Sequence, residues 1–375
     1  MFFNLVSPTT SYIIIMSSTA NDDTHKYCDE GRGSGASSKE MCTSSCEQNK
    51  NVDSSDSNST SSTDINLAVD GINKMSISNT SIRLSTCANC GKEGIDSDMN
   101  TCNKCNSVKY CNAACKKKHR KKHKKKCDRR VAEMHEEKLF KQPPVREDCP
   151  ICFLVLPAIE SGRRYYSCCG KLICCGCTFA NIDMNGADDC PFCRHPSSGT
   201  AMEMRKLLEN RMEKKNDAVA IYNLGCGYNR GTYGCPLNRN EALELWHRAG
   251  ELGCTYAYHN IACAYFRGTG VRRDEKKASH YWELAAIGGN ILARHNLGVE
   301  EEETGNVDRA LKHYMISAAV GYSDSLVAIK GLFIKGHATK DIYGKAIRSY
   351  QSYLDDIKSH QRDEAAAYNE QYRYY

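Results

Sequence analysis

The chain has 375 residues, which is more than one hydrophobic core usually serves, so we expect two or more folded units. Its formal net charge is only +6, with much of the basic excess in residues 115–130, so the overall charge predicts no class of partner. A secreted or membrane-bound protein is not expected, because no Lys or Arg precedes Lys26, the apolar run 12–16 is too short for a signal peptide, and no run could span a bilayer. The sequence therefore predicts an intracellular protein, in the cytoplasm or the nucleus, with no membrane partner.

Residues 1–82 are rich in Ser, Thr, Asn and Asp and have no sustained hydrophobic period. Such a segment buries too little apolar surface to offset the entropy lost on ordering, so we expect it to be disordered. Cys28, Cys42 and Cys46 lie within it and have no His or Cys at ligand spacing, so we do not expect them to bind metal.

Closely spaced cysteines begin at Cys87, and in a reducing compartment they indicate a metal, by default zinc. A Cys-x-x-Cys pair can point two thiolates at one ion from a tight turn, and an i, i+4 pair can do so from one face of a helix. Eight such ligands suit two closed tetrahedral zinc sites. They form four pairs: Cys87/Cys90, Cys102/Cys105, Cys111/Cys115 and His123/Cys127.

The spacing of these pairs and the YC element at 110–111 resemble the MYND-type zinc finger, a small interaction module, over roughly residues 87–127. We name residues 83–130 the first finger. The resemblance implies an interleaved pairing, in which the first and third pairs hold one zinc ion and the second and fourth pairs hold the other. Residues 131–146 are expected to continue the finger's helix to about Phe140 and then to form a linker, because Pro143 and Pro144 end it.

The first finger departs from the family at two places. Lys116 and Arg120 stand where a Gln and a nearby Trp commonly help to form a groove for proline-containing peptides, so a peptide-binding role is not carried over. His119 fits the row of ligands but would be a ninth, so we interpret it as a neighbour of the metal site. The lysine run around it is interpreted as a solvated helix face, with nuclear import or phosphate contact as alternatives.

A second group of cysteines occupies the segments CPIC (149–152), SCCGKLICCGC (167–177) and CPFCRHP (190–196). Its order of pairs resembles a RING-type zinc finger, and we name residues 147–198 the second finger. Lys171 stands where a common RING places a histidine ligand, and an ammonium group cannot bind zinc. The resemblance to all-cysteine variants implies two sites: Cys149, Cys152, Cys174 and Cys177 in one, and Cys168, Cys169, Cys190 and Cys193 in the other. Cys175 is then spare, and His195 is an alternative ligand.

Some RING fingers are ubiquitin ligases, and the resemblance assigns that activity to surface residues rather than to zinc. Ile151 and Pro191 match the apolar platform that binds a ubiquitin-conjugating enzyme, and Arg194 matches the basic residue that holds the donor ubiquitin. Zinc sites with four protein ligands leave no open position for water, so we expect no catalytic residue among the ligands.

The remaining chain is predicted to be helical. Residues 200–216 read as a connecting helix, and residues 217–358 hold repeating units with aligned Asn223, Asn260 and Asn296 and aligned aromatics at Trp246, Trp282 and Tyr314. A period of roughly 36 residues, with small residues on one helix and an aromatic on the next, is typical of stacked helix pairs. These units resemble Sel-one-like repeats, whose solenoid has a concave side that suits protein binding. Residues 359–375 are expected to be a C-terminal tail.

The predicted fold class is therefore multidomain: a disordered N-terminus, two small zinc-stabilised fingers with four zinc ions in all, and an all-α repeat solenoid. Three functions from different classes fit it. The chain can be a RING-type ubiquitin ligase whose repeats bind a client, which is our main prediction, or a non-catalytic adaptor that only binds proteins. Regulation of nucleic acid through the lysine run is the weakest alternative, because it rests on a single run of charge.

Overall fold

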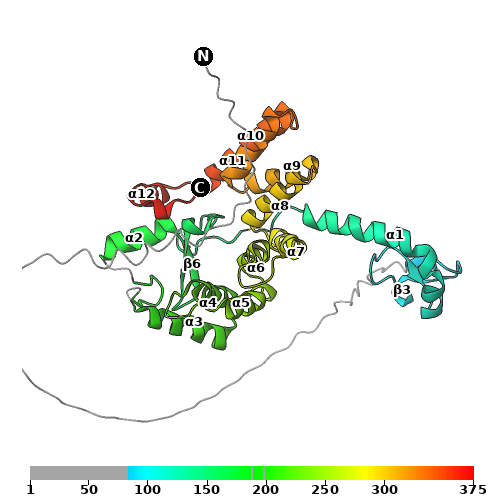
Figure 1. Ribbon diagram of the computed structural model, residues 1–375, viewed down its shortest axis with the longest axis horizontal. Coiled ribbons are helices and arrows are strands. Elements are labelled where there is room, and N and C mark those ends of the chain that lie inside the picture. Colours follow the sequence, from blue (N-terminus) through cyan, green and yellow to red (C-terminus); the bar gives the residue numbers. More distant parts are fainter. Residues whose placement is uncertain (1–82, 145, 187–188, 197–198) are drawn as a thin grey trace, which may run out of the picture. The chain divides into compact units, whose positions relative to one another are not determined.

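The computed structural model describes residues 83–375 except 145, 187–188 and 197–198 (Figure 1). The expected disorder of residues 1–82 and the expectation for the three cysteines in that segment lie outside these residues. The described residues up to Lys124 and those from Lys125 onward form two compact units, and each is described by itself. Within the described ranges, no helix combines the length and the hydrophobicity needed to cross a bilayer.

The first finger contains two short antiparallel hairpins and the beginning of a long helix. Strand β1 (Leu84–Thr86) pairs with β2 (Glu93–Ile95), and β3 (Asn100–Thr101) pairs with β4 (Lys109–Tyr110). A single turn, η2 (Asp96–Asp98), joins the hairpins, and helix α1 (Ala113–Leu139) follows β4. Asn112 starts this helix, because its side-chain oxygen accepts the backbone N–H of Cys115 at 2.8 Å.

The second finger is a hairpin followed by a helix. After the turn η3 (Glu160–Gly162), strand β5 (Arg163–Tyr166) pairs with β6 (Lys171–Cys174), and helix α2 (Cys175–Asn185) follows directly. Gly170 closes the hairpin with φ 72°, in the left-handed region that favours glycine. A small core of Leu156, Tyr166 and Ile173 lies among the cysteines.

In the described residues from 199 onward, nine further helices precede the C-terminal segment. Their bounds are α3 (Ala201–Lys215), α4 (Ala218–Arg230), α5 (Arg239–Glu251), α6 (Thr255–Arg267), α7 (Glu275–Ile287), α8 (Ile291–Glu303), α9 (Val307–Ala318), α10 (Ser323–Ile334) and α11 (Lys340–Ile357). From α4 onward they pack as consecutive antiparallel pairs, so the predicted class of a finger region followed by stacked helical repeats is confirmed for the described residues (Figure 1).

Each repeat is held together by an aromatic ring packed against a small residue. A Cβ atom added to Gly225 would lie 2.6 Å from the Trp246 ring, and one added to Gly298 would lie 2.5 Å from the Tyr314 ring. A larger residue at either glycine would therefore force the two helices of the pair apart. Trp246, Trp282 and Tyr314 are all buried.

The second finger packs on the first helices of successive repeat pairs. The Tyr222 hydroxyl on α4 donates to Glu160 at 3.2 Å, and the Tyr256 hydroxyl on α6 donates to the Ala158 carbonyl at 2.9 Å. Further along the array, Ala158 and Cys175 share an apolar cluster with residues of α8 and α11: Ile291, Leu292, Tyr353 and Ile357. The surface of the repeats around Tyr222, Tyr256 and Tyr353 is therefore covered by the chain's own finger.

Residues 359–375 are not a free tail. They form helix α12 (His360–Tyr368) and the turn η4 (Glu370–Tyr372), which lie against α2. The rings of Phe179 and Tyr368 have their centroids 5.0 Å apart, and Tyr374 is buried. The aromatic side chains of this segment give it enough apolar surface to stay folded on the finger.

The end of α1 packs on the middle repeats, within the unit that begins at Lys125. Leu139 is buried with Trp282, and its carbonyl accepts a hydrogen bond from the buried guanidinium of Arg294. Phe140 lies against His313, with ring centroids 4.6 Å apart. The helix ends at Leu139, one residue before the predicted end.

Candidate metal centres

Four groups of cysteine and histidine side chains have their ligand atoms close enough to bind one metal ion each. In every group the four atoms lie within 4.8 Å of one another. These groups bring together all sixteen metal ligands predicted from the sequence, in the predicted partition. The quartets are Cys87, Cys90, Cys111 and Cys115; Cys102, Cys105, His123 and Cys127; Cys149, Cys152, Cys174 and Cys177; and Cys168, Cys169, Cys190 and Cys193.

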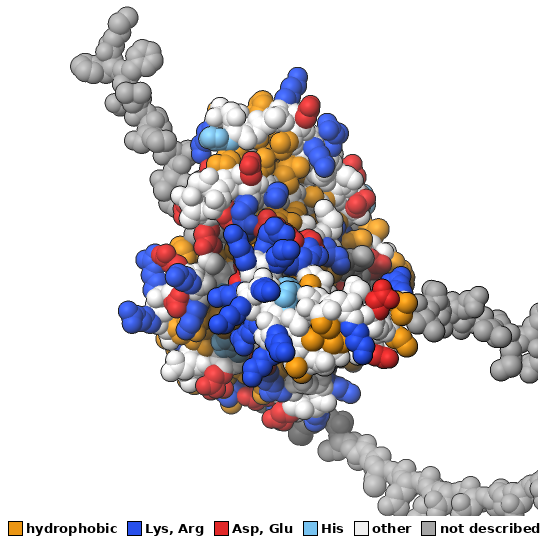
Figure 2. Space-filling model, turned by 90° about the vertical axis from the view of Figure 1, so that its right-hand side faces the viewer, with side chains coloured by type: hydrophobic (Ala, Val, Ile, Leu, Met, Phe, Trp, Pro, Cys, Tyr) orange, Lys and Arg blue, Asp and Glu red, His pale blue; other side chains and the backbone are white. Residues whose placement is uncertain are grey.

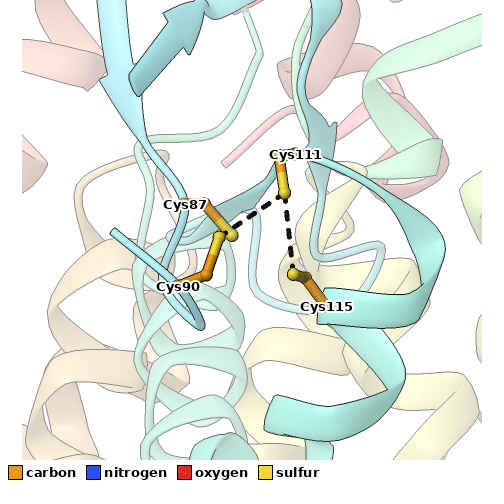
Figure 3. Close-up of side chains that lie close together, drawn as sticks. All are labelled: Cys87, Cys90, Cys111 and Cys115. Carbon is orange, nitrogen blue, oxygen red and sulfur yellow. Dashed lines mark hydrogen bonds between the residues drawn. The ribbon is translucent and has the colours of Figure 1, made fainter. Parts of the chain in front are cut away.

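Figure 3 shows the first quartet, whose side chains point toward one another from a turn and from the start of α1. The sulfur of Cys111 lies 3.7 Å from that of Cys90 and 3.6 Å from that of Cys115. The side-chain amide of Asn89 donates to the Cys115 sulfur at 3.4 Å. Sulfur atoms at these separations suit the corners of one tetrahedron.

The second quartet is more deeply buried and includes the histidine. The Cys105 sulfur lies 3.2 Å from Nε2 of His123, and the Ser107 hydroxyl lies 3.0 Å from the same sulfur. His119 is not part of the group, but its ring stacks on that of His123 and its Nδ1 lies 3.2 Å from the Tyr110 hydroxyl. His119 therefore orients a ligand rather than serving as one.

Four Cys-x-x-Cys turns, one in each quartet, have the same backbone geometry. In each, the residue after the second cysteine has a positive φ, and its N–H donates to the carbonyl of the first cysteine at 2.8–3.0 Å. These residues are Gly91, Asn106, Phe153 and Arg194. The turns of the second finger thus repeat those of the first, although Phe153 and Arg194 adopt a conformation that is unfavourable for residues of their size.

These turns also favour the thiolate form of their first cysteine. Backbone N–H groups, foremost that of Cys111, lower the pKa of Cys87 to about 6. Burial raises the pKa of Cys102, but the N–H groups of Cys105 and Lys104 outweigh it and bring the value to about 6. Hydrogen bonds from the side chains of Cys174 and Cys177 lower the pKa of Cys149. Thiolates are the form of cysteine that binds metal, so the surroundings of these three cysteines favour binding of a cation.

The second finger assembles its two quartets around the β5–β6 hairpin. The sulfurs of Cys149 and Cys177 lie 3.8 Å apart, as do those of Cys152 and Cys174. The adjacent Cys168 and Cys169 at the hairpin tip both join the other quartet, in which the sulfurs of Cys169 and Cys190 are 3.4 Å apart. Cys175 is buried in the apolar cluster with Ile291, and Nδ1 of the exposed His195 lies 2.8 Å from the Pro196 carbonyl rather than near the quartet.

The donor sets fit a soft tetrahedral cation. Three quartets supply four thiols and one supplies three thiols and an imidazole, which is the ligand chemistry of structural zinc. Each set is complete with four protein ligands, so a bound ion would have no open position for a substrate. The centres can therefore organise the chain but are not suited to catalysis.

The first finger belongs to a known class of module. Residues 87–127 match the MYND finger. Residues 218–254 and 255–290 each match the Sel1 repeat. These matches confirm two of the predicted resemblances, and the resemblance of residues 147–196 to a RING-type finger stays a prediction.

Two curated proteins of Schizosaccharomyces pombe are similar to part of the chain. Chitin synthase regulatory factor 4 is 31% identical over 104 residues, which cover 28% of this chain and 16% of that protein. Chitin synthase regulatory factor 2 is 30% identical over 80 residues, which cover 21% and 16%. The chain thus matches about a sixth of the length of these relatives.

Two solved structures are also similar. The Sel1 repeat protein of Oxalobacter formigenes is 23% identical, with a TM-score of 0.36, and the match covers 44% of this chain and 68% of that one. A protective antigen with an SLR fold from uropathogenic Escherichia coli is 21% identical, with a TM-score of 0.36, and the match covers 52% and 40%.

The place of the family's glutamine in the MYND finger is filled by a side chain that is already engaged. The Lys116 ammonium donates to the Thr101 carbonyl at 2.9 Å and to the Asn103 side chain at 2.7 Å. This lysine ties α1 to the β3–β4 hairpin. The structure therefore gives Lys116 a role in the finger's own fold.

The other lysines of α1 are exposed. Figure 2 shows a face of the molecule on which Lys and Arg side chains gather densely. Within the described residues, seven exposed lysines between Cys115 and Cys127 form no ion pair with a carboxylate. They are Lys117, Lys118, Lys121, Lys122, Lys124, Lys125 and Lys126. Their ammonium groups lie on the solvent side of α1, while His123 and Cys127 are buried on its other side.

We expect replacement of Lys121, Lys122, Lys124 and Lys125 by Gln to leave metal content and folding of the MYND finger unchanged, because none of these side chains contacts the metal sites. Metal analysis and circular dichroism of the purified protein check this. Loss of nuclear accumulation in the same variant would assign the run to import. Salt-sensitive binding to duplex DNA that disappears in the variant would assign it to nucleic acid.

The predicted partner-binding residues of the second finger lie on its two exposed turns. Ile151 is 39% exposed, Arg194 is exposed, and Pro191 is partly buried. Sequence reasoning missed Phe153, which is 78% exposed in the turn beside Ile151, and Phe192, which is 40% exposed next to Pro191. Both residues are next to a cysteine ligand in the sequence, and such positions face outward on a tight turn. This spacing could have identified them from the sequence.

Proposed function

We propose that this chain is a zinc-stabilised scaffold that binds other proteins and has no chemistry of its own. The observation that carries the proposal is that all four metal centres are complete sets of four protein ligands, which suits structural zinc. The MYND finger and the Sel1 repeats are both modules of protein interaction. The similarity to two proteins named as regulatory factors also supports a regulatory role over a catalytic one.

The packing of the second finger restricts where partners can bind. Because Glu160 and Ala158 engage Tyr222 and Tyr256, the face formed by α4 and α6 is not free for a client. Partners are then expected on the MYND finger and on the outer surface of the repeats.

The scaffold proposal is tested by proximity labelling with the intact chain and with a Cys87→Ser, Cys90→Ser variant, which loses one centre of the MYND finger. The expected result is that one set of neighbours disappears while the neighbours of the repeats remain. Loss of all neighbours, or of none, would contradict a scaffold with separate binding modules.

We expect the purified protein to contain four zinc ions per chain, two in each finger, because every quartet has the geometry of a closed site. Metal analysis after removal of loosely bound ions checks this. A content near two would show that one finger does not bind zinc. A Cys193→Ser variant then tells which finger is empty. It should contain one ion fewer than the unaltered protein if the second finger binds zinc, and the same number if it does not.

A second candidate function is ubiquitin ligation, favoured by the exposed apolar side chains Ile151, Phe153 and Phe192 on the turns of the second finger. None of them is a metal ligand, so their exposure suits contact with another protein. The resemblance to RING-type fingers names a ubiquitin-conjugating enzyme as that partner.

We expect Ile151→Ala to keep four zinc ions and a normal melting profile but to lose any ubiquitin transfer, because it removes an apolar contact and no ligand. Arg194→Ala should still bind the conjugating enzyme but discharge its ubiquitin slowly. Autoubiquitination with a panel of conjugating enzymes measures both, and Leu237→Ala, which truncates an exposed side chain of the repeats, is the matched control. If the unaltered protein neither transfers ubiquitin nor binds a conjugating enzyme by titration, this candidate fails and the scaffold remains.

A further inference from the structure

Arg362, in the C-terminal helix α12, is a completely buried arginine beside a metal centre. It lies 210 residues from Cys152, and its Nη2 is 3.9 Å from the sulfur of that cysteine. Nη1 donates to the Ile357 carbonyl at 2.6 Å, and Nε has no hydrogen-bond partner among the described residues. The guanidinium therefore links the carbonyl at the end of α11 to a ligand of the second finger.

A buried guanidinium is costly unless negative charge lies close to it, because it loses its hydration and cannot release its proton. None of the carboxylates in the described part of the chain forms an ion pair with Arg362. The carboxylate of the following residue, Asp363, accepts a hydrogen bond from Tyr374 instead. The negative charge that faces the guanidinium is that of the cysteine sulfurs.

The quartet of Cys149, Cys152, Cys174 and Cys177 supplies such charge when it holds zinc. Four thiolates and one divalent cation carry a net charge of −2, and this charge is enclosed because three of the four cysteines are buried. A cation at hydrogen-bond distance from the Cys152 sulfur halves the net charge of the centre and fixes the orientation of that ligand.

The finger is shaped to accept α12 at this point. A Cβ atom added to Gly176, between the two ligands Cys174 and Cys177 and next to the second, would lie 2.8 Å from the backbone nitrogen of Arg362 and 2.9 Å from the carbonyl carbon of Gln361. Only glycine lets α12 approach this closely. The close approach and the buried cation are two separate features that join the C-terminal segment to the same metal centre.

We propose that Arg362 is the counter-cation of the zinc–thiolate centre formed by Cys149, Cys152, Cys174 and Cys177, so that residues 359–375 complete the second finger. This inference rests on the zinc loading proposed above. It gives the C-terminal segment a defined task, which is to neutralise and orient the ligands of a centre that the chain builds some 200 residues earlier.

The test is the reactivity of Cys152 in Arg362→Met, which keeps much of the side-chain volume and removes the charge. We expect Cys152 to be alkylated by iodoacetamide, and zinc to be extracted by a chelator, about tenfold faster than in the unaltered protein. Mass spectrometry resolves the site, and the rate at Cys111 of the first finger is the internal reference. Arg294→Met is the matched control, because Arg294 is also a buried arginine but donates to the carbonyls of Leu139 and Ala286.

An unchanged rate at Cys152 in folded Arg362→Met would overturn the proposal, and so would an equal increase in Arg294→Met. Arg362→Lys keeps the charge and is expected to stay within about threefold of the unaltered protein; a tenfold increase in this variant would show that charge is not what Arg362 supplies. The zinc content of the unaltered protein separates the two proposals. Two ions per chain, with no ion lost in Cys193→Ser, would refute the zinc loading of the second finger, whereas four ions with no effect of Arg362→Met would refute the role of Arg362 alone.

Discussion

Replacing Cys149 with Ser is expected to destabilise the repeats as well as to unfold the second finger. Zinc binding supplies folding free energy to a small finger, on the order of 10 kcal/mol for structural sites, so loss of one ligand should disorder it. The repeats should respond because the finger covers Tyr222, Tyr256 and Leu292 on three successive repeat pairs. Exposing large side chains that are normally packed costs about 2–5 kcal/mol each when the contact is lost completely.

The measurement is thermal unfolding followed by helical circular dichroism. We expect the variant to melt roughly 10 °C or more below the unaltered protein, since a few kcal/mol shifts a domain of this size by several degrees. Cys87→Ser is the matched control, because it removes a buried ligand of the same chemistry from the MYND finger. A repeat transition that is unchanged in Cys149→Ser would show that the finger contributes nothing to the stability of the repeats.

The ligands of the four centres could be predicted from the sequence because their spacing is local. Two cysteines separated by two residues must share a turn, and the resemblance to all-cysteine RING-type fingers implied the pairing of Cys168 with Cys169, where Lys171 cannot bind. The repeats were predictable for the same reason, since their helices meet their neighbours in sequence order.

The packing of the second finger on the repeats could not be predicted, because it joins segments far apart in the chain. The N–H of Ala158 donates to the hydroxyl of Tyr353, which lies 195 residues away. A contact over this distance in sequence leaves no periodic pattern from which it could be predicted. Residues 359–375 read as a tail because their apolar side chains are mostly aromatics spread among polar residues. Their partner, helix α2, becomes visible only in the fold.

Buried histidines make the repeats sensitive to acid. Burial lowers the pKa of His313 to about 3, helped by the charges of Arg294, Arg309 and Lys312. Burial also lowers the pKa of His295 to about 4. An unfolded histidine has a pKa near 6.5, so below that pH the unfolded chain binds protons that the folded chain does not. Stability should therefore be unaffected above pH 6.5 and fall between pH 6.5 and about 4.

Replacing His313 with Leu separates this effect from acid release of zinc. Neither ring nitrogen of His313 has a hydrogen-bond partner among the described residues, so Leu should already stabilise the protein by about 1 kcal/mol at pH 7. The difference in unfolding free energy between the two proteins, which we call the gap, should widen as the pH falls from 6.5 to 4, by at most about 1.4 kcal/mol per pH unit. Urea unfolding at several pH values measures the gap, and zinc loss cancels because both proteins lose the same ions. His337→Gln, at an exposed histidine, is the control and should show no widening. A gap that stays constant from pH 7 to pH 4 would mean that His313 takes up its proton without unfolding the repeats.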